Sequence, residues 1–96
     1  MGGILRMTQI LELDPVLDMN AAAPLKSALL ERRGQPIEID ASKVQRLGGL
    51  CLQVLLAARR SWAEDGQPLH VKPRSEAFTD ALRLFGTDAQ FSEANL

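Results

Sequence analysis

The 96-residue sequence has one cysteine, one tryptophan, three phenylalanines and no tyrosine, and its formal net charge is −1. The single cysteine, Cys51, excludes an intramolecular disulfide and suits a reducing compartment. A net charge this close to zero disfavours the basic surface that nucleic-acid binding needs. No apolar run reaches the roughly 18 residues of a membrane-spanning helix, and the first residues lack the pattern of a secretory signal peptide. We therefore expect a cytoplasmic protein that binds no nucleic acid and does not insert into a membrane.

Residues that carry catalysis or bind metals are also scarce. His70 is the only histidine and stands between Leu69 and Val71 in a predicted strand, with no cysteine or carboxylate at metal-ligand spacing. Cys51 lies on the apolar stripe of a predicted helix, where a buried thiol is favoured over a reactive one, although a nearby helix start lowers a thiol pKa. No nucleophile and base are seen to converge. The sequence therefore predicts a protein that is not an enzyme and that holds neither a metal ion nor a cofactor.

Turn-forming residues divide the chain into alternating strands and helices. Alternation of apolar and polar residues indicates strands, and apolar residues that recur every three or four positions indicate helices. The predicted strands and helices cover, in order, residues 9–13, 20–34, 36–42, 48–65, 68–73 and 75–86. Asn20 and Ser75 are the predicted N-caps, and Gly66 and Gly86 are the predicted helix stops. Phe91 is expected to pack back on the core from one last turn.

The order of these elements predicts a single α/β domain over residues 1–96. Consecutive strands that are joined by a helix pair in parallel through right-handed crossovers. Because the strands alternate in polarity, we expect the helices to cover mostly one face of the sheet. The prediction is a small, mainly parallel, mixed sheet of about four strands. The apolar face of the last helix is predicted to comprise Phe78, Ala81, Leu82 and Phe85.

Two glycines, Gly48 and Gly49, open the most apolar helix. They follow the second strand, at the carboxyl edge where α/β sheets bind ligands and partners. Free N–H groups favour an anion there, whereas the simpler interpretation is that the glycines permit a sharp turn and close packing. The segment lacks the Lys and Ser/Thr of a phosphate loop, which disfavours a nucleotide site. Asp18 and Asp40 stand near the ends of the first two strands and either border this edge or cap turns.

Three segments occur in an order typical of one family. They are PVLDMNAAAPLKSALL, PIEIDASKVQRLGGLCLQVLLAA and PLHVKPRSEAFTDALRLFG. Their order and spacing resemble the STAS domain of bacterial anti-sigma factor antagonists, from Leu11 to about Phe91. Leu17 and Asp18 match the Leu-Asp pair that precedes the family's first helix. The resemblance implies a STAS-like α/β fold for nearly the whole chain.

The resemblance also implies what the two glycines replace. In the family, an apolar residue, an aspartate and a phosphoacceptor Ser or Thr open the second helix, and phosphorylation by a partner kinase breaks the complex. Aligning Leu47 with the apolar residue places Gly48 at the aspartate and Gly49 at the hydroxyl. Because glycine cannot accept phosphate, we predict that the usual switch is absent. Ser42 matches no phosphoacceptor position and is expected to form a local turn bond.

The function that the resemblance implies is that of a non-catalytic adaptor. Its expected partner is a protein kinase or kinase-like ATPase domain, and a chemotaxis histidine kinase is favoured. The residues expected to bind the partner are Asp18, Asn20, Ser42, Arg46, Gly48, Gly49 and Leu50. Two alternatives stay open: an anti-sigma factor antagonist of a partner-switching system, and the STAS subunit of a lipid-transport ABC complex, whose relatives keep threonine at the acceptor position. The sequence leaves the oligomeric state open.

Overall fold

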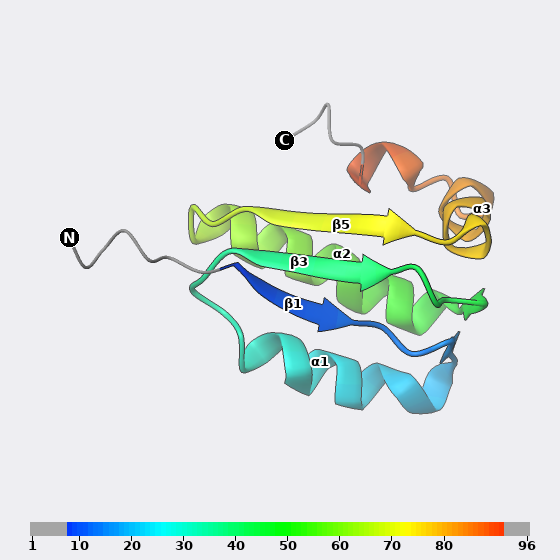
Figure 1. Cartoon of the computed structure of the whole chain (residues 1–96), viewed down its shortest axis with the longest axis horizontal. Coiled ribbons are helices and arrows are strands. Elements are labelled where there is room, and N and C mark those ends of the chain that lie inside the picture. The colour runs from blue at the N-terminus through cyan, green and yellow to red at the C-terminus, as the bar shows by residue number, and fades with distance from the viewer. Residues whose placement is uncertain (1–7, 92–96) are drawn as a thin grey trace.

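A computed structural model describes residues 8–91, which form a three-stranded sheet with helices packed against it (Figure 1). The strands are β1 (Gln9–Glu12), β3 (Ile37–Ala41) and β5 (Leu69–Arg74), in the spatial order β1-β3-β5. Both pairings are parallel. The three predicted strands are confirmed, and every pairing within the described residues is parallel, as strands joined by helices require. The expected mixed sheet of about four strands is corrected for residues 8–91, where this sheet has three strands and no antiparallel pairing.

The helices are α1 (Ala22–Leu30), α2 (Gly49–Glu64) and α3 (Glu76–Leu84). Two short 3₁₀ helices, η2 (Met19–Ala21) and η3 (Asp88–Phe91), precede α1 and follow α3. In Figure 1, α2 lies behind the sheet, its neighbour α1 lies below β1, and α3 lies beyond the end of β5. The placement of helices mostly on one face of the sheet is therefore confirmed.

One apolar core fills the space between the sheet and the helices. Ile37, Ile39 and Ala41 are fully buried at every second position of β3, the period that sends alternate side chains to one face. The stripe of α2 that is buried in the core comprises Cys51, Leu52, Leu55, Ala58 and Trp62. The Trp62 indole Nε1 donates to the Gln35 carbonyl oxygen at 2.7 Å, which satisfies the one polar atom of this large side chain.

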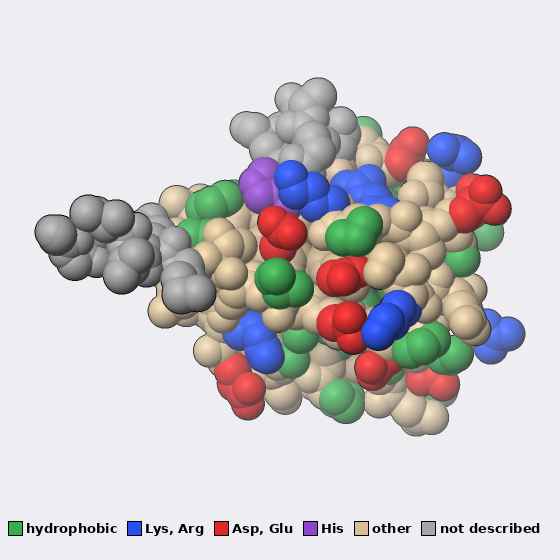
Figure 2. Space-filling view, in the orientation of Figure 1, with side chains coloured by type: hydrophobic (Ala, Val, Ile, Leu, Met, Phe, Trp, Pro, Cys, Tyr) green, Lys and Arg blue, Asp and Glu red, His purple; other side chains and the backbone are tan. Residues whose placement is uncertain are grey.

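The opposite face of the sheet is polar and carries only scattered apolar side chains. Ile10 of β1 is 66% exposed and pairs with Glu38 of β3, which in turn pairs with His70 of β5. Figure 2 views this face and shows basic, acidic and apolar side chains interspersed. The alternation of polarity along the strands predicted this difference between the two faces.

The helix ends confirm one predicted cap and correct another. Ser75 caps α3, because its Oγ accepts a hydrogen bond from the Phe78 N–H at 3.0 Å. The predicted cap at Asn20 is wrong: Asp18 Oδ1 accepts from the N–H groups of Asn20 and Ala21, at 3.0 and 3.2 Å. The chain turns into η2 at Met19, before α1 begins, so the capping position moves two residues toward the N-terminus.

The C-terminal part of the described chain supplies a second correction. Phe91 in η3 is buried, as predicted, and its carbonyl oxygen accepts a hydrogen bond from the Arg74 guanidinium. Phe85, expected on the apolar face of the last helix, is 46% exposed. The reason is that α3 ends at Leu84, so the helical spacing that places Phe78 and Leu82 in the core does not extend to Phe85.

Candidate functional site

A small parallel pair of strands, absent from the sequence prediction, builds the site. β2 (Val16–Leu17) pairs with β4 (Arg46–Leu47), and it joins the segment before η2 to the segment before α2. The Gly48 N–H extends the pair by donating to the Leu17 carbonyl oxygen at 2.9 Å. This pairing places Asp18 beside the start of α2, thirty residues away in the sequence.

Gly48 allows two backbone segments to approach each other closely. Its φ and ψ of −87° and 166° are open to any residue, so the turn into α2 requires no left-handed conformation. A Cβ on Gly48 would lie 3.2 Å from the Leu17 carbonyl oxygen, tighter than ordinary van der Waals contact. Gly48 is also the N-cap of α2 and offers no side-chain oxygen to the first turn. Glycine is favoured at position 48 because the Leu17 backbone approaches it closely, and not because the chain turns sharply there.

Gly49 is under no such constraint. It is the exposed first residue of α2, and its φ lies outside the left-handed region. The nearest atom to an added Cβ would be Phe85 Cε1, at 4.0 Å, which is ordinary contact. A side chain at position 49 would therefore fit without rearrangement, and it would lie beside the Phe85 ring.

Exposed apolar side chains flank the two glycines. Met19 is 72% exposed and directly follows Asp18, Leu50 is 49% exposed in the first turn of α2, and Phe85 lies next to Gly49. We call the surface formed by Asp18, Met19, Gly48, Gly49, Leu50 and Phe85 the α2-end surface. Large apolar side chains that gather on the surface of a small domain are typical of a protein-binding site.

The thiol of Cys51 packs beneath this surface and is removed from solvent. Its side chain is fully buried, and Sγ donates to the Asp18 carbonyl oxygen at 3.3 Å. Burial raises the pKa of the Cys51 thiol from its ordinary value of 9.0, and the negative charge of Asp18 raises it further. The favoured expectation for Cys51, a buried thiol in the apolar core, is therefore confirmed, and its pKa is raised where a reactive thiol near a helix start would have a lowered one.

Ser42 is held by its own loop, between β3 and β4. Its Oγ and backbone N–H both donate to Asp40 Oδ1, at 2.7 and 2.9 Å. These two hydrogen bonds lower the pKa of the Asp40 carboxyl from its ordinary value of 3.8. The local turn bond predicted for Ser42 is present, and Asp40 serves this turn.

The remaining predicted residues lie in different places. Asn20 is exposed in η2, and Arg46 is exposed in β4 opposite Val16. His70 is half-buried in β5, on the sheet face away from α1 and α2. Within residues 8–91, no group of three or more His, Cys, Asp or Glu side chains is placed to hold a metal ion. In the same range, every helix is too short or too polar to cross a membrane.

Sequence reasoning missed two members of the α2-end surface, Met19 and Phe85. Met19 follows the Leu-Asp pair in a turn, where an apolar residue has no core to join. Phe85 directly precedes the helix stop Gly86, where helical periodicity ends. The turn at Met19 therefore indicated exposure, whereas the helical spacing of Phe85 indicated burial. Only the pairing of β2 with β4 and the packing of α3 against β4 bring the two residues to the glycines.

Comparison with known proteins agrees with this architecture. A family model described as "Mlab, STAS domain" matches residues 4–93. No curated protein matches the sequence. Among solved structures, a sulfate transporter family protein from Wolinella succinogenes is similar with a TM-score of 0.76 and 20% sequence identity, over 90% of this chain and 72% of that chain. At this identity the likeness shows a shared fold. Because the family model spans nearly the whole sequence, this chain belongs to the STAS domain family.

Proposed function

We propose that this STAS domain is a non-catalytic adaptor that docks through its α2-end surface on a protein kinase or kinase-like ATPase domain. A chemotaxis histidine kinase is the favoured partner. The observation that carries the proposal concerns Gly49. The position that the family resemblance assigns to the phosphoacceptor hydroxyl is the exposed first residue of α2, and it has no side chain.

Packing does not account for the missing hydroxyl. An added Cβ on Gly49 would meet only the Phe85 ring, at 4.0 Å, so a serine would fit there. The loss therefore changes the chemistry of the surface and leaves its shape nearly intact. A docking surface without a phosphoacceptor binds its partner without being released by phosphorylation, which suits a constitutive adaptor.

The composition of the α2-end surface supports docking to a protein. Met19, Leu50 and Phe85 are 72%, 49% and 46% exposed, so they present apolar area that a partner would remove from water. Asp18, which is exposed, adds a charged group to the same surface. An apolar centre with a polar border is the usual anatomy of a protein interface.

The test compares Gly49→Asp with Gly49→Asn in the full chain. The two side chains have nearly the same size, and only aspartate adds a charge. An unpaired carboxylate buried in an interface is costly, so we expect Gly49→Asp to weaken partner binding at least about tenfold and Gly49→Asn by less than about threefold. Affinity purification from the native host identifies the partner, and biolayer interferometry measures the dissociation constants.

Stability provides the control for this comparison. A carboxylate in the first turn of α2 interacts favourably with the helix dipole, so the melting temperature of Gly49→Asp should equal or exceed that of the parent. Lost binding then reflects the surface and not unfolding. Equal binding by Gly49→Asp and the parent would show that the partner docks elsewhere.

The identity of the recovered partner decides among the functional alternatives. Recovery of a histidine kinase supports the proposed adaptor function. A kinase that binds a sigma factor supports an anti-sigma factor antagonist, which would then have to work without phosphorylation at position 49. The ATPase of a transporter supports a STAS subunit of a lipid-transport ABC complex.

A further inference from the structure

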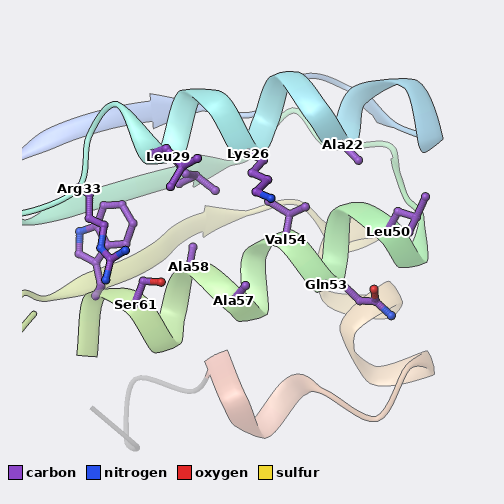
Figure 3. Close-up of a pocket in the computed structure, with 12 residues that line it drawn as sticks. Ala22, Lys26, Leu29, Arg33, Leu50, Gln53, Val54, Ala57, Ala58 and Ser61 are labelled. Atoms are coloured by element: carbon purple, nitrogen blue, oxygen red, sulfur yellow. The ribbon is translucent and has the colours of Figure 1, made fainter. Parts of the chain in front are cut away.

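A second surface lies between α1 and α2, on the side of these helices that faces away from the sheet (Figure 3). It is a groove with a volume of about 320 Å³. Apolar and small side chains of α2, among them Leu50, Val54 and Ala57, form one wall, and Leu30 of α1 contributes to the other. Apart from Leu50, the groove and the α2-end surface share no residue.

The groove is long, shallow and open to solvent. Leu30 and Leu50 are 57% and 49% exposed, and Ala57 is exposed as well. From Leu50 to Ser61, the α2 wall extends for about 17 Å, or three helical turns, at the usual rise of about 1.5 Å per residue. A third helix packs well against two neighbouring helices in such a groove, because the small side chains of Ala57 and Ser61 allow close approach.

The charges of the groove have one sign. Its lining includes Lys26 and Arg33 and, within the described chain, no carboxylate. The Arg33 Nε lies 2.8 Å from Asp65 Oδ2, so that cation is already paired at one end of the groove. Lys26 extends from the middle of α1 across the groove toward Val54 (Figure 3). An occupant that complements this lining carries apolar groups along its length and a negative charge opposite Lys26.

We propose that this groove binds an amphipathic helix of a partner protein, with its apolar side chains over Ala57 and a carboxylate paired with Lys26. A helix that binds in a groove contacts it through apolar side chains at positions i, i+3, i+4 and i+7 of its own sequence. The α2 residues that line this groove have the same spacing, from Leu50 through Val54 to Ala57. A lipid chain is disfavoured, because exposed walls at Leu30 and Leu50 would leave much of it in water. The inference goes beyond the proposed function, since it concerns a different surface.

The experiment places a photoreactive residue in the groove. The full chain carries p-benzoylphenylalanine in place of Ala57 or, as a matched control, in place of Ala63, an exposed alanine of the same helix that does not line the groove. Both forms are expressed in the native host and irradiated, and mass spectrometry locates the cross-linked segment. We expect position 57, and not position 63, to capture a segment of another protein with helical apolar spacing and flanking Asp or Glu.

A synthetic peptide of the captured segment then tests the contacts by fluorescence anisotropy. Ala57→Glu should raise its dissociation constant at least about tenfold, because it places a carboxylate under the apolar face of the bound helix. Lys26→Glu should raise it about fivefold, the effect of one exposed ion pair. Ala63→Glu and Gly49→Asp should leave it unchanged, which separates this groove from the α2-end surface.

Several results would overturn the proposal. Position 57 could capture a lipid, a second copy of this chain, or a protein segment whose apolar residues lack helical spacing, and each of these results would contradict it. Equal capture at positions 57 and 63, or no capture at either, would contradict it as well. Unchanged peptide affinity in Lys26→Glu would also overturn it, as would loss of peptide binding in Gly49→Asp.

Discussion

The adjacent glycines that open α2 should respond in opposite directions to the same substitution. Gly49→Ala adds a methyl group 4.0 Å from Phe85 Cε1, at a backbone conformation that alanine accepts. The substitution reduces the conformational entropy of the unfolded chain, so we expect stabilisation by about 0.4–1 kcal/mol. Gly48→Ala also reduces that entropy, but two effects oppose the gain.

The first effect at Gly48 is steric. The new Cβ would lie 3.2 Å from the Leu17 carbonyl oxygen, which also accepts the Gly48 N–H at 2.9 Å. Because both atoms belong to the β2–β4 pairing, relief of the contact must move one backbone segment. The second effect is that alanine is a poorer N-cap than glycine. We expect Gly48→Ala to destabilise the domain by about 1 kcal/mol, so the two variants should differ by about 1.5–2 kcal/mol.

Urea unfolding measures this difference, and Trp62 provides the signal, because the only tryptophan is buried in the core. For a domain of this size the difference corresponds to roughly 10 °C in melting temperature. Equal urea dependence of the unfolding free energy in both variants would confirm that the native and unfolded states are otherwise unchanged. Stabilisation of equal size by Gly48→Ala and Gly49→Ala would refute the close approach at Gly48.

Three further predictions concern single side chains. Ser75→Ala removes the N-cap hydrogen bond to the Phe78 N–H and should cost about 1–2 kcal/mol in urea unfolding, whereas Ser75→Thr should restore most of the loss. Native Cys51 should react with iodoacetamide far more slowly than the unfolded chain, since burial keeps its thiol protonated; equal rates would contradict its burial. The lowered pKa of Asp40 stabilises the fold above its ordinary value of 3.8, and this contribution is lost as the pH falls below that value. The stability difference between the parent and Asp40→Ala should therefore shrink on acidification through this range, and a constant difference would exclude the Ser42 hydrogen bonds as its cause.

Much of the fold follows from local patterns in the sequence. Ile37 and Ile39 alternate with polar residues, and that period alone predicts a strand with one buried face. Leu55, Ala58 and Trp62 recur at helical spacing, which predicts the buried stripe of α2. Ser75 is a cap because its hydroxyl reaches a nearby backbone N–H, an interaction within four residues. Such features depend on neighbours along the chain, so the sequence contains them directly.

The candidate site depends on residues that are distant in the sequence. β2 and β4 have two residues each, too few for any periodicity, and they meet across about thirty residues. Phe85 reaches Gly49 only because α3 packs beside β4, and it escapes the core because α3 ends one residue earlier.

The sequence by itself therefore determined the order of the three longer strands and the three α-helices, most of their buried faces, and the absence of a side chain at Gly49. The tertiary structure decided which exposed side chains surround that glycine, why Gly48 favours glycine, and that α1 and α2 leave an open groove between them. The physical reason is the distance in sequence over which each interaction acts. Side-chain periodicity and capping involve residues within a few positions of each other, whereas close backbone approach and surface shape arise when segments distant in the sequence pack together.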